Sequence, residues 1–280
     1  MIKTNELEKF EITFKTLSPV SISPRESYCF YKEIDYGDEV SEANIIYPFY
    51  QYGEYEEFDL NAQYYIPGSA LKGALLSGFT EQEKKEFNKM YVDDIGVDYE
   101  DLVLTTPCKL QYIRNLDDLD SNKKPTFSEF FPNVEVQMLK GDRTFKATIY
   151  AKDEDTLESL QRKVPKLTQE KLKAAKKVIC QLIGKIDSRI GKEEIGSTEC
   201  QKWTFSKKEL ETFRDKLLQY ENKNIIFLGG YKGEVLSKVL PKSNANDKEI
   251  NSYQGTFYRD EELGLPFGLV KILPIEGTQS

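Results

Sequence analysis

The alternation of apolar and polar residues is clearest near the start of the chain, in residues 9–19. Phe10, Ile12 and Phe14 fall on one side of an extended segment, while charged and hydroxyl residues fall on the other. This two-residue period predicts a half-buried β-strand. Prolines in residues 18–24 then end the regular structure.

The same period recurs later in the chain. In residues 133–151, two apolar series flank a polar turn at 140–143, which predicts a β-hairpin in the central sheet. Residues 102–115 have β character, and residues 224–228 and 265–272 predict a short apolar strand and a closing strand.

A 3.6-residue period predicts helices at 69–79, 153–162, 168–190 and 207–220. In residues 168–190, an apolar stripe runs from Leu172 to Ile190. Lys173, Lys176 and Lys177 lie largely off that stripe. They form either a solvated lysine face or a phosphate-facing surface, and the pattern favours neither.

The other segments are less regular. Residues 80–101 predict irregular structure or a short helix, residues 116–132 a loop, and residues 241–251 a polar linker. Residues 28–59 mix tyrosine and phenylalanine with acidic residues and carry few basic ones. We expect edge strands there that pack aromatic rings or contact a protein, because the negative charge would repel RNA phosphates. The overall order predicts an α+β protein.

Two glycine-containing segments are candidate binding sites. In residues 64–78, a strand end and a Pro-Gly turn lead into a helix, with Ser69 in the expected N-cap position and Lys72 in the first turns. Hydroxyl, ammonium and backbone N–H donors at a helix start suit a phosphate. The second segment, residues 229–233, lacks the P-loop spacing, but its glycines allow close backbone approach.

The composition of the chain excludes several kinds of catalytic and metal site. The chain has 280 residues, a net charge of −8 and no histidine, which removes Ser-His-Asp and Cys-His catalysis and the commonest transition-metal ligand. The four cysteines form no Cys-x-x-Cys pair, so we expect neither a zinc site nor a disulfide framework. No apolar run approaches the roughly 20 residues of a membrane span. We expect a cytoplasmic protein.

Three sequence segments resemble motifs of a known protein family. Residues 66–74 resemble the Ile-Pro-Gly-Ser-Ser-Leu-Lys-Gly motif of the RAMP superfamily, the RNA-binding subunits of CRISPR effector complexes. Here Ala70 replaces the second serine, and Leu76 stands where arginine is common. Residues 17–22 and 266–271 are similar to the ends of the type III-A (Csm) subunit that caps the 3′ end of the guide RNA (crRNA).

The resemblance implies a ferredoxin-like (RRM-like) RAMP core. It would form a single domain over residues 1–280, with insertions at about 28–59 and 80–132 and a helical segment at about 153–220. A glycine-rich loop after a late strand is also typical of the family. The RNA-binding residues implied are Gly68, Ser69, Lys72, Gly229, Gly230, Tyr231, Lys232 and Gly233.

The implied function is non-catalytic binding of crRNA within a type III complex, together with a part in crRNA 3′-end maturation. Its partners would be crRNA and neighbouring RAMP subunits, with target RNA nearby, no membrane, no cofactor and no metal. Two alternatives remain open. Asp35 or Asp38 could serve a metal-dependent RAMP endoribonuclease, although acids crowd that segment and such carboxylates are commonly solvated. The chain could instead be a protein-interaction module without RNA binding.

Overall fold

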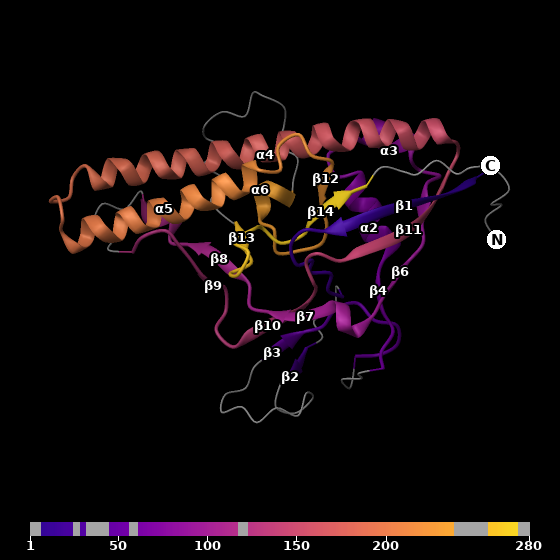
Figure 1. Cartoon of the computed structure of the whole chain (residues 1–280), viewed down its shortest axis with the longest axis horizontal. Helices are drawn as coiled ribbons and strands as arrows, with labels where there is room; N and C mark the ends of the chain where they lie inside the picture. Colours follow the sequence, from indigo (N-terminus) through magenta and orange to yellow (C-terminus); the bar gives the residue numbers. More distant parts are fainter. Residues whose placement is uncertain are drawn as a thin grey trace.

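A computed structural model describes residues 7–24, 29–31, 45–55, 61–116, 123–237 and 257–273. The predicted linker at 241–251 and the acidic residues Asp35 and Asp38 lie outside these ranges. Figure 1 shows a long helix lying above a mixed set of sheets.

The principal sheet has five strands, each antiparallel to its neighbours. In spatial order they are β12 (Ile225–Phe227), β14 (Leu269–Ile272), β1 (Glu8–Thr16), β11 (Thr144–Ala151) and β5 (Tyr91–Val92). The strands predicted at 9–19, 224–228 and 265–272 are therefore confirmed. The last of them is shorter than expected.

Two helices cover one face of this sheet: α2 (Gly68–Leu75) and the N-terminal part of α4 (Glu154–Ile190). Along the chain the order is β1, α2, β5, β11, α4, β14, and in the sheet β14 lies beside β1, then β11, then β5. This is the order and antiparallel arrangement of a ferredoxin-like fold, with β12 added at one edge. The α+β, ferredoxin-like fold class is thus confirmed by strand order.

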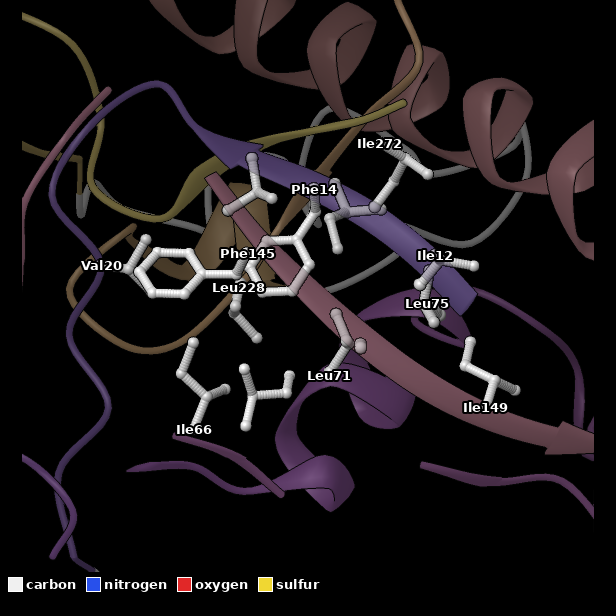
Figure 2. Packing of buried hydrophobic residues seen from close by; sticks show 14 of the residues in the cluster. Ile12, Phe14, Val20, Ile66, Leu71, Leu75, Phe145, Ile149, Leu228 and Ile272 are labelled. Atoms are coloured by element: carbon white, nitrogen blue, oxygen red, sulfur yellow. The ribbon is translucent and has the colours of Figure 1, made fainter. Parts of the chain in front are cut away.

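The core lies between this sheet and the two helices. Figure 2 shows Leu71 and Leu75 of α2 beside Ile12 of β1 and Ile149 of β11. Alternate residues of β1 and β11 are buried, so the two-residue period of the sequence is the pattern of core contacts.

Three smaller sheets surround the core. One contains β2 (Phe30–Tyr31), β3 (Ile45–Tyr47), β10 (Val134–Leu139) and β7 (Leu102–Thr105). A second contains β13 (Tyr258–Arg259), β8 (Cys108–Gln111) and β9 (Thr126–Glu129), and a third pairs β4 (Tyr64–Ile66) with β6 (Ile95–Val97). The remaining helical turns are α3 (Glu81–Glu86), η1 (Tyr99–Asp101), η2 (Ile113–Leu116) and α6 (Glu234–Ser237).

The hairpin predicted in residues 133–151 is wrong. Both strands exist, but β10 pairs with β3 and β7, whereas β11 pairs with β1 and β5. Thr16 separates them: its hydroxyl donates to the carbonyl of Lys140 (2.7 Å) and accepts from the backbone N–H of Arg143 (2.9 Å). Because Thr16 takes up the polar groups of the turn, the two strands diverge into different sheets.

The two helices predicted at 153–162 and 168–190 are one continuous helix, α4. Pro165 lies within it but does not break it, because buried residues on both sides of the proline hold the helix in place. Leu160 and Val164 pack on the principal sheet, and Thr168 donates to the carbonyl of Ile225 at 2.5 Å.

The second half of α4 packs against α5 (Thr198–Leu218), which begins earlier than predicted. The two helices lie side by side and extend beyond the principal sheet (Figure 1). The apolar stripe of α4 is buried against α5 as expected, whereas Lys173, Lys176 and Lys177 are exposed.

Other expectations are revised in part. The loop predicted at 116–132 contains η2's last residue and β9, and residues 80–101 contain α3, β5 and β6. In the aromatic segment, strands β2 and β3 form, but only β2 is an edge strand, because β3 pairs with both β2 and β10; Phe49 is fully buried, which fits packing. Tyr52 is 51% exposed and stacks on Tyr65 with ring centroids 4.0 Å apart.

Candidate functional site

Among the described residues lies an open groove of about 770 Å³. Its walls come from the exit of β1 (Ser21, Ile22, Ser23), the start of α2 (Pro67, Ser69, Ala70), the glycine-rich loop and α6 (Gly229, Gly230, Tyr231, Gly233, Glu234, Ser237), and the side chains of Tyr50 and Tyr258. The two glycine-containing segments singled out from the sequence therefore line a single groove.

The start of α2 differs from the predicted anion site. Pro67, not Ser69, occupies the N-cap position, and no side chain caps the helix from there. The backbone N–H of Gly68 donates instead to the carboxylate of Asp94 at 2.8 Å. An internal anion thus takes a donor expected to hold a phosphate. Ser69 lies inside the first turn, exposed, where its hydroxyl lines the groove.

Gly68 itself is explained by packing. A Cβ atom at this position would lie 1.9 Å from the carbonyl oxygen of Val92. Any larger residue would therefore push α2 away from β5. The glycine is needed for this close approach whatever the groove binds.

Lys72 points away from the groove. Its ammonium donates to the carbonyl of Met90 at 2.6 Å and lies 5.7 Å from the ring centroid of Tyr91. Partial burial lowers the pKa of Lys72. In this conformation the side chain ties α2 to the segment before β5, and Lys72 is not among the residues that line the groove.

The glycine-rich loop is bound to the exit of β1. Gly229 has φ +79°, and a Cβ there would lie 2.1 Å from the carbonyl oxygen of Ser21. The N–H of Gly230 donates to that same oxygen at 2.7 Å. Only glycine permits this approach and this backbone conformation at 229. The loop is thus held rigidly against the wall formed by residues 21–23.

Tyr231 is the aromatic residue of this loop that lines the groove. Its φ is +47°, and its ring meets Tyr258 edge to face with centroids 5.6 Å apart. Burial, followed by the neighbouring Tyr47 and Tyr258, raises the pKa of Tyr231. The phenol therefore stays neutral across the physiological range and can donate a hydrogen bond.

Lys232 turns inward. Its ammonium donates to the carbonyl of Phe227 at 3.0 Å. Burial, followed by repulsion from the nearby ammonium of Lys171, lowers the pKa of Lys232 to about 7. Neither Lys72 nor Lys232 lines the groove, so the direct phosphate contacts expected of them require a different side-chain position.

The groove is lined by neutral donors. Serine hydroxyls come from positions 21, 23, 69 and 237, and phenols from Tyr50, Tyr231 and Tyr258; the lining residues within the described ranges include one carboxylate, Glu234, and no lysine or arginine. Ser23 Oγ is buried and has no hydrogen-bond partner among the described residues. Such a surface can hydrogen-bond ribose hydroxyls and phosphate oxygens, but it supplies little Coulomb attraction.

Sequence reasoning missed part of this lining. Ser21 and Ser23 lie in the segment where prolines end β1, and only the later folding of the glycine-rich loop against it brings them to a site. Tyr258 follows the predicted linker and carried no local signal. Tyr50 sits among many aromatic residues of the 28–59 segment, so its pattern did not distinguish it.

Metal ligands do not gather in the described ranges. No cluster of three or more cysteine, aspartate or glutamate side chains there could hold an ion. Asp35 and Asp38, the carboxylates considered for metal-dependent cleavage, are outside those ranges. Of the helices that the structure describes, none is both long and apolar enough to cross a bilayer.

Comparison with known proteins gives a distant likeness among solved structures. No protein-family model and no curated protein sequence matches the chain. Among solved structures, it is similar to a chain of the "Cryo-EM structure of the Type III-B Cmr-beta bound to cognate target RNA", with 18% identity and a TM-score of 0.32. The match covers 59% of this chain and 53% of that chain, so this chain spans about half the neighbour's length. A likeness this weak carries no argument about function.

Proposed function

We propose that the chain is a non-catalytic, RNA-binding RAMP subunit of a type III CRISPR effector complex, and that the groove holds the backbone of the guide RNA. The observation that carries this proposal is the meeting of two segments far apart in sequence. The RAMP-like motif contributes Ser69, the glycine-rich loop contributes Gly229 to Gly233, and both line one groove.

The fold supports the proposal because a ferredoxin-like core is what the motif resemblance implies. The strand order β14-β1-β11-β5 with α2 and α4 on one face provides that core independently of any motif. The segment similar to the opening of type III-A capping subunits, residues 17–22, leaves β1 and forms a wall of the same groove. We therefore favour the position at the crRNA 3′ end, with neighbouring RAMP subunits as protein partners, target RNA nearby and a part in crRNA 3′-end maturation.

The physical mechanism is backbone recognition. Hydroxyl and phenol donors bind phosphate and ribose oxygens and so position a strand without reading its sequence. The chain is acidic overall and its groove lacks charged donors among the described lining residues, so we expect modest affinity for RNA by the isolated chain. Neighbouring subunits would supply the remaining contacts.

The test introduces one negative charge into the groove. Ser69→Glu places a carboxylate beside the expected phosphates, and Ser188→Glu is the matched control, since Ser188 is an exposed serine on α4. Both variants change the net charge equally. A unit charge about 4 Å from a phosphate costs about 1–4 kcal/mol near a protein surface. We expect Ser69→Glu to weaken binding of a labelled oligouridylate RNA about tenfold or more in low salt.

Two results would count against the proposal. Equal affinity of the two variants would remove the groove as the RNA site. Failure of the full-length wild-type chain to bind RNA at low salt, or to co-purify with crRNA and other subunits, would remove the RNA-binding function itself. Magnesium-dependent cleavage abolished by Asp35→Ala or Asp38→Ala would favour the endoribonuclease instead.

A further inference from the structure

Four aromatic side chains form a continuous row that starts in the groove and leaves it. Tyr231 meets Tyr258 with ring centroids 5.6 Å apart, and Tyr258 meets Phe130 at 5.2 Å. Phe130 in turn lies 4.1 Å from Phe131. Tyr231 and Tyr258 line the groove, whereas Phe131 is 52% exposed. The row therefore connects the groove with the open surface of the molecule.

The small sheet β13-β8-β9 places Tyr258 beside Lys109 on one face. Tyr258 of β13 pairs with Lys109 of β8, and Lys109 pairs with Ser128 of β9, two residues before Phe130. Residues of alternate parity, such as Leu110 and Phe127, face the core beneath α5. The sheet thus has a core face and an outward face that carries Tyr258 and Lys109, while Phe130 and Phe131 follow the end of β9.

Lys109 gives this outward face a positive charge. Its ammonium lies 4.7 Å from the ring centroid of Phe130 and 5.7 Å from that of Tyr258. Among the described carboxylates, none forms an ion pair with Lys109. Burial, followed by Glu261 and more weakly Glu129, raises the pKa of the Cys108 thiol. The side chain of Cys108 lies on the opposite face of the sheet from Lys109.

An aromatic row with a lysine ammonium beside it is a surface on which single-stranded nucleic acids can stack their bases. Each base offers a π-face to a ring, and the ammonium can contact the phosphate between two bases. Continuity with the groove selects this occupant over a protein partner, because a strand whose backbone occupies the groove would be led directly along the rings.

We infer that Tyr258, Phe130 and Phe131, with Lys109, form a stacking platform for unpaired RNA bases at the exit of the groove. The inference rests on the proposed function and extends it. The groove holds the backbone of the strand, and the platform holds the bases of the nucleotides that leave it. Stacking of this kind tolerates any base, so the platform adds affinity without sequence preference.

The experiment compares two labelled probes: an oligouridylate RNA and an oligomer of the same length without bases. Phe131→Leu and the double variant Phe130→Leu with Phe131→Leu remove rings. Phe205→Leu is the matched control because Phe205 is 63% exposed on α5. We expect the full-length ring variants to bind oligouridylate about fivefold or more weakly than wild type, with unchanged affinity for the abasic oligomer. Phe205→Leu should bind both probes like wild type.

A salt series on Lys109→Met, with the exposed Lys208→Met as its control, tests the phosphate contact. The slope of log affinity against log salt should become shallower by about 0.7 for Lys109→Met and should not change for Lys208→Met. The ring variants should keep the wild-type slope.

Other results would overturn the inference. Wild-type affinity of the ring variants for oligouridylate, or an equal loss on both probes, would exclude base stacking at these residues. If Ser69→Glu still weakens RNA binding in that case, the platform is wrong and the groove stands. If wild type binds neither probe at low salt, the proposed function fails and the platform fails with it.

Discussion

The replacement Lys171→Met should make the protein more stable at neutral pH. Lys171 lies on α4 and is only 5% exposed, and its ammonium donates to Ser77 Oγ at 2.7 Å. Burial lowers the pKa of Lys171 from 10.5 to about 8. Lys232, whose pKa also falls, lies near enough for the two positive charges to repel one another.

The size of the effect follows from the pKa difference. A change from 10.5 to about 8, at 1.36 kcal/mol for each tenfold step in the protonation equilibrium, corresponds to about 3 kcal/mol of unfavourable free energy at pH 7. Losing the hydrogen bond to Ser77 lowers the free energy of unfolding by about 1 kcal/mol. We therefore expect Lys171→Met to raise the free energy of unfolding by about 2 kcal/mol at pH 7.

The sign of the pH dependence follows from proton counts. Between about pH 8 and pH 10.5 the unfolded chain holds the Lys171 proton more tightly than the folded protein. The free-energy penalty of burying charged Lys171 therefore has its full value below about pH 8 and decreases as pH rises through this window. Wild type should gain stability relative to Lys171→Met between pH 8 and pH 10.

Urea unfolding followed by circular dichroism at pH 7, 8 and 9 measures this difference. Lys176→Met is the control, because Lys176 is an exposed lysine on the same helix and its removal should change stability by less than about 0.5 kcal/mol. The reasoning is refuted if Lys171→Met is less stable than wild type at pH 7, or if the gap between them stays constant with pH.

Three further predictions concern the start of α2 and the chemistry of the groove. Gly68→Ala should destabilise the protein by roughly 2 kcal/mol or more because of its close backbone contact, whereas Gly73→Ala, with open space around it, should stabilise by about 0.5–1 kcal/mol; thermal melting of both compares them. Asp94→Asn should lower the melting temperature slightly and strengthen RNA binding, since it removes a negative charge from the helix start; weaker RNA binding would contradict this. RNA affinity should be the same with and without a metal chelator, and incubation with magnesium should leave the bound RNA intact on a denaturing gel.

Local periodicity predicted much of the fold. The alternation around Phe10, Ile12 and Phe14 identified β1, and the stripe beginning at Leu172 identified the buried face of α4. Pairing could not be predicted in the same way. The alternation around Val136 suits any sheet, so it could not show that β10 pairs with β3 and β7 and not with β11, the next strand in sequence.

The candidate site, like the fold, could be predicted only in part from the sequence. Its two glycine-containing segments could be identified from their sequence motifs. The directions in which their side chains point could not be predicted from those motifs. The ammonium groups of Lys72 and Lys232 donate to backbone carbonyls. The carboxylate of Asp94, which lies between β5 and β6, accepts from the backbone N–H at the start of α2. These contacts depend on residues distant in sequence, so no local pattern could predict them.

The most direct test of the account maps where RNA touches the full-length protein. RNA containing 4-thiouridine is crosslinked to the protein by ultraviolet light, and the modified peptides are identified by mass spectrometry. We predict crosslinks in the peptides that hold residues 21–23 and 229–237, both of which contribute to the groove lining. Crosslinks confined to the exposed lysines of α4, such as Lys173 and Lys176, would contradict it.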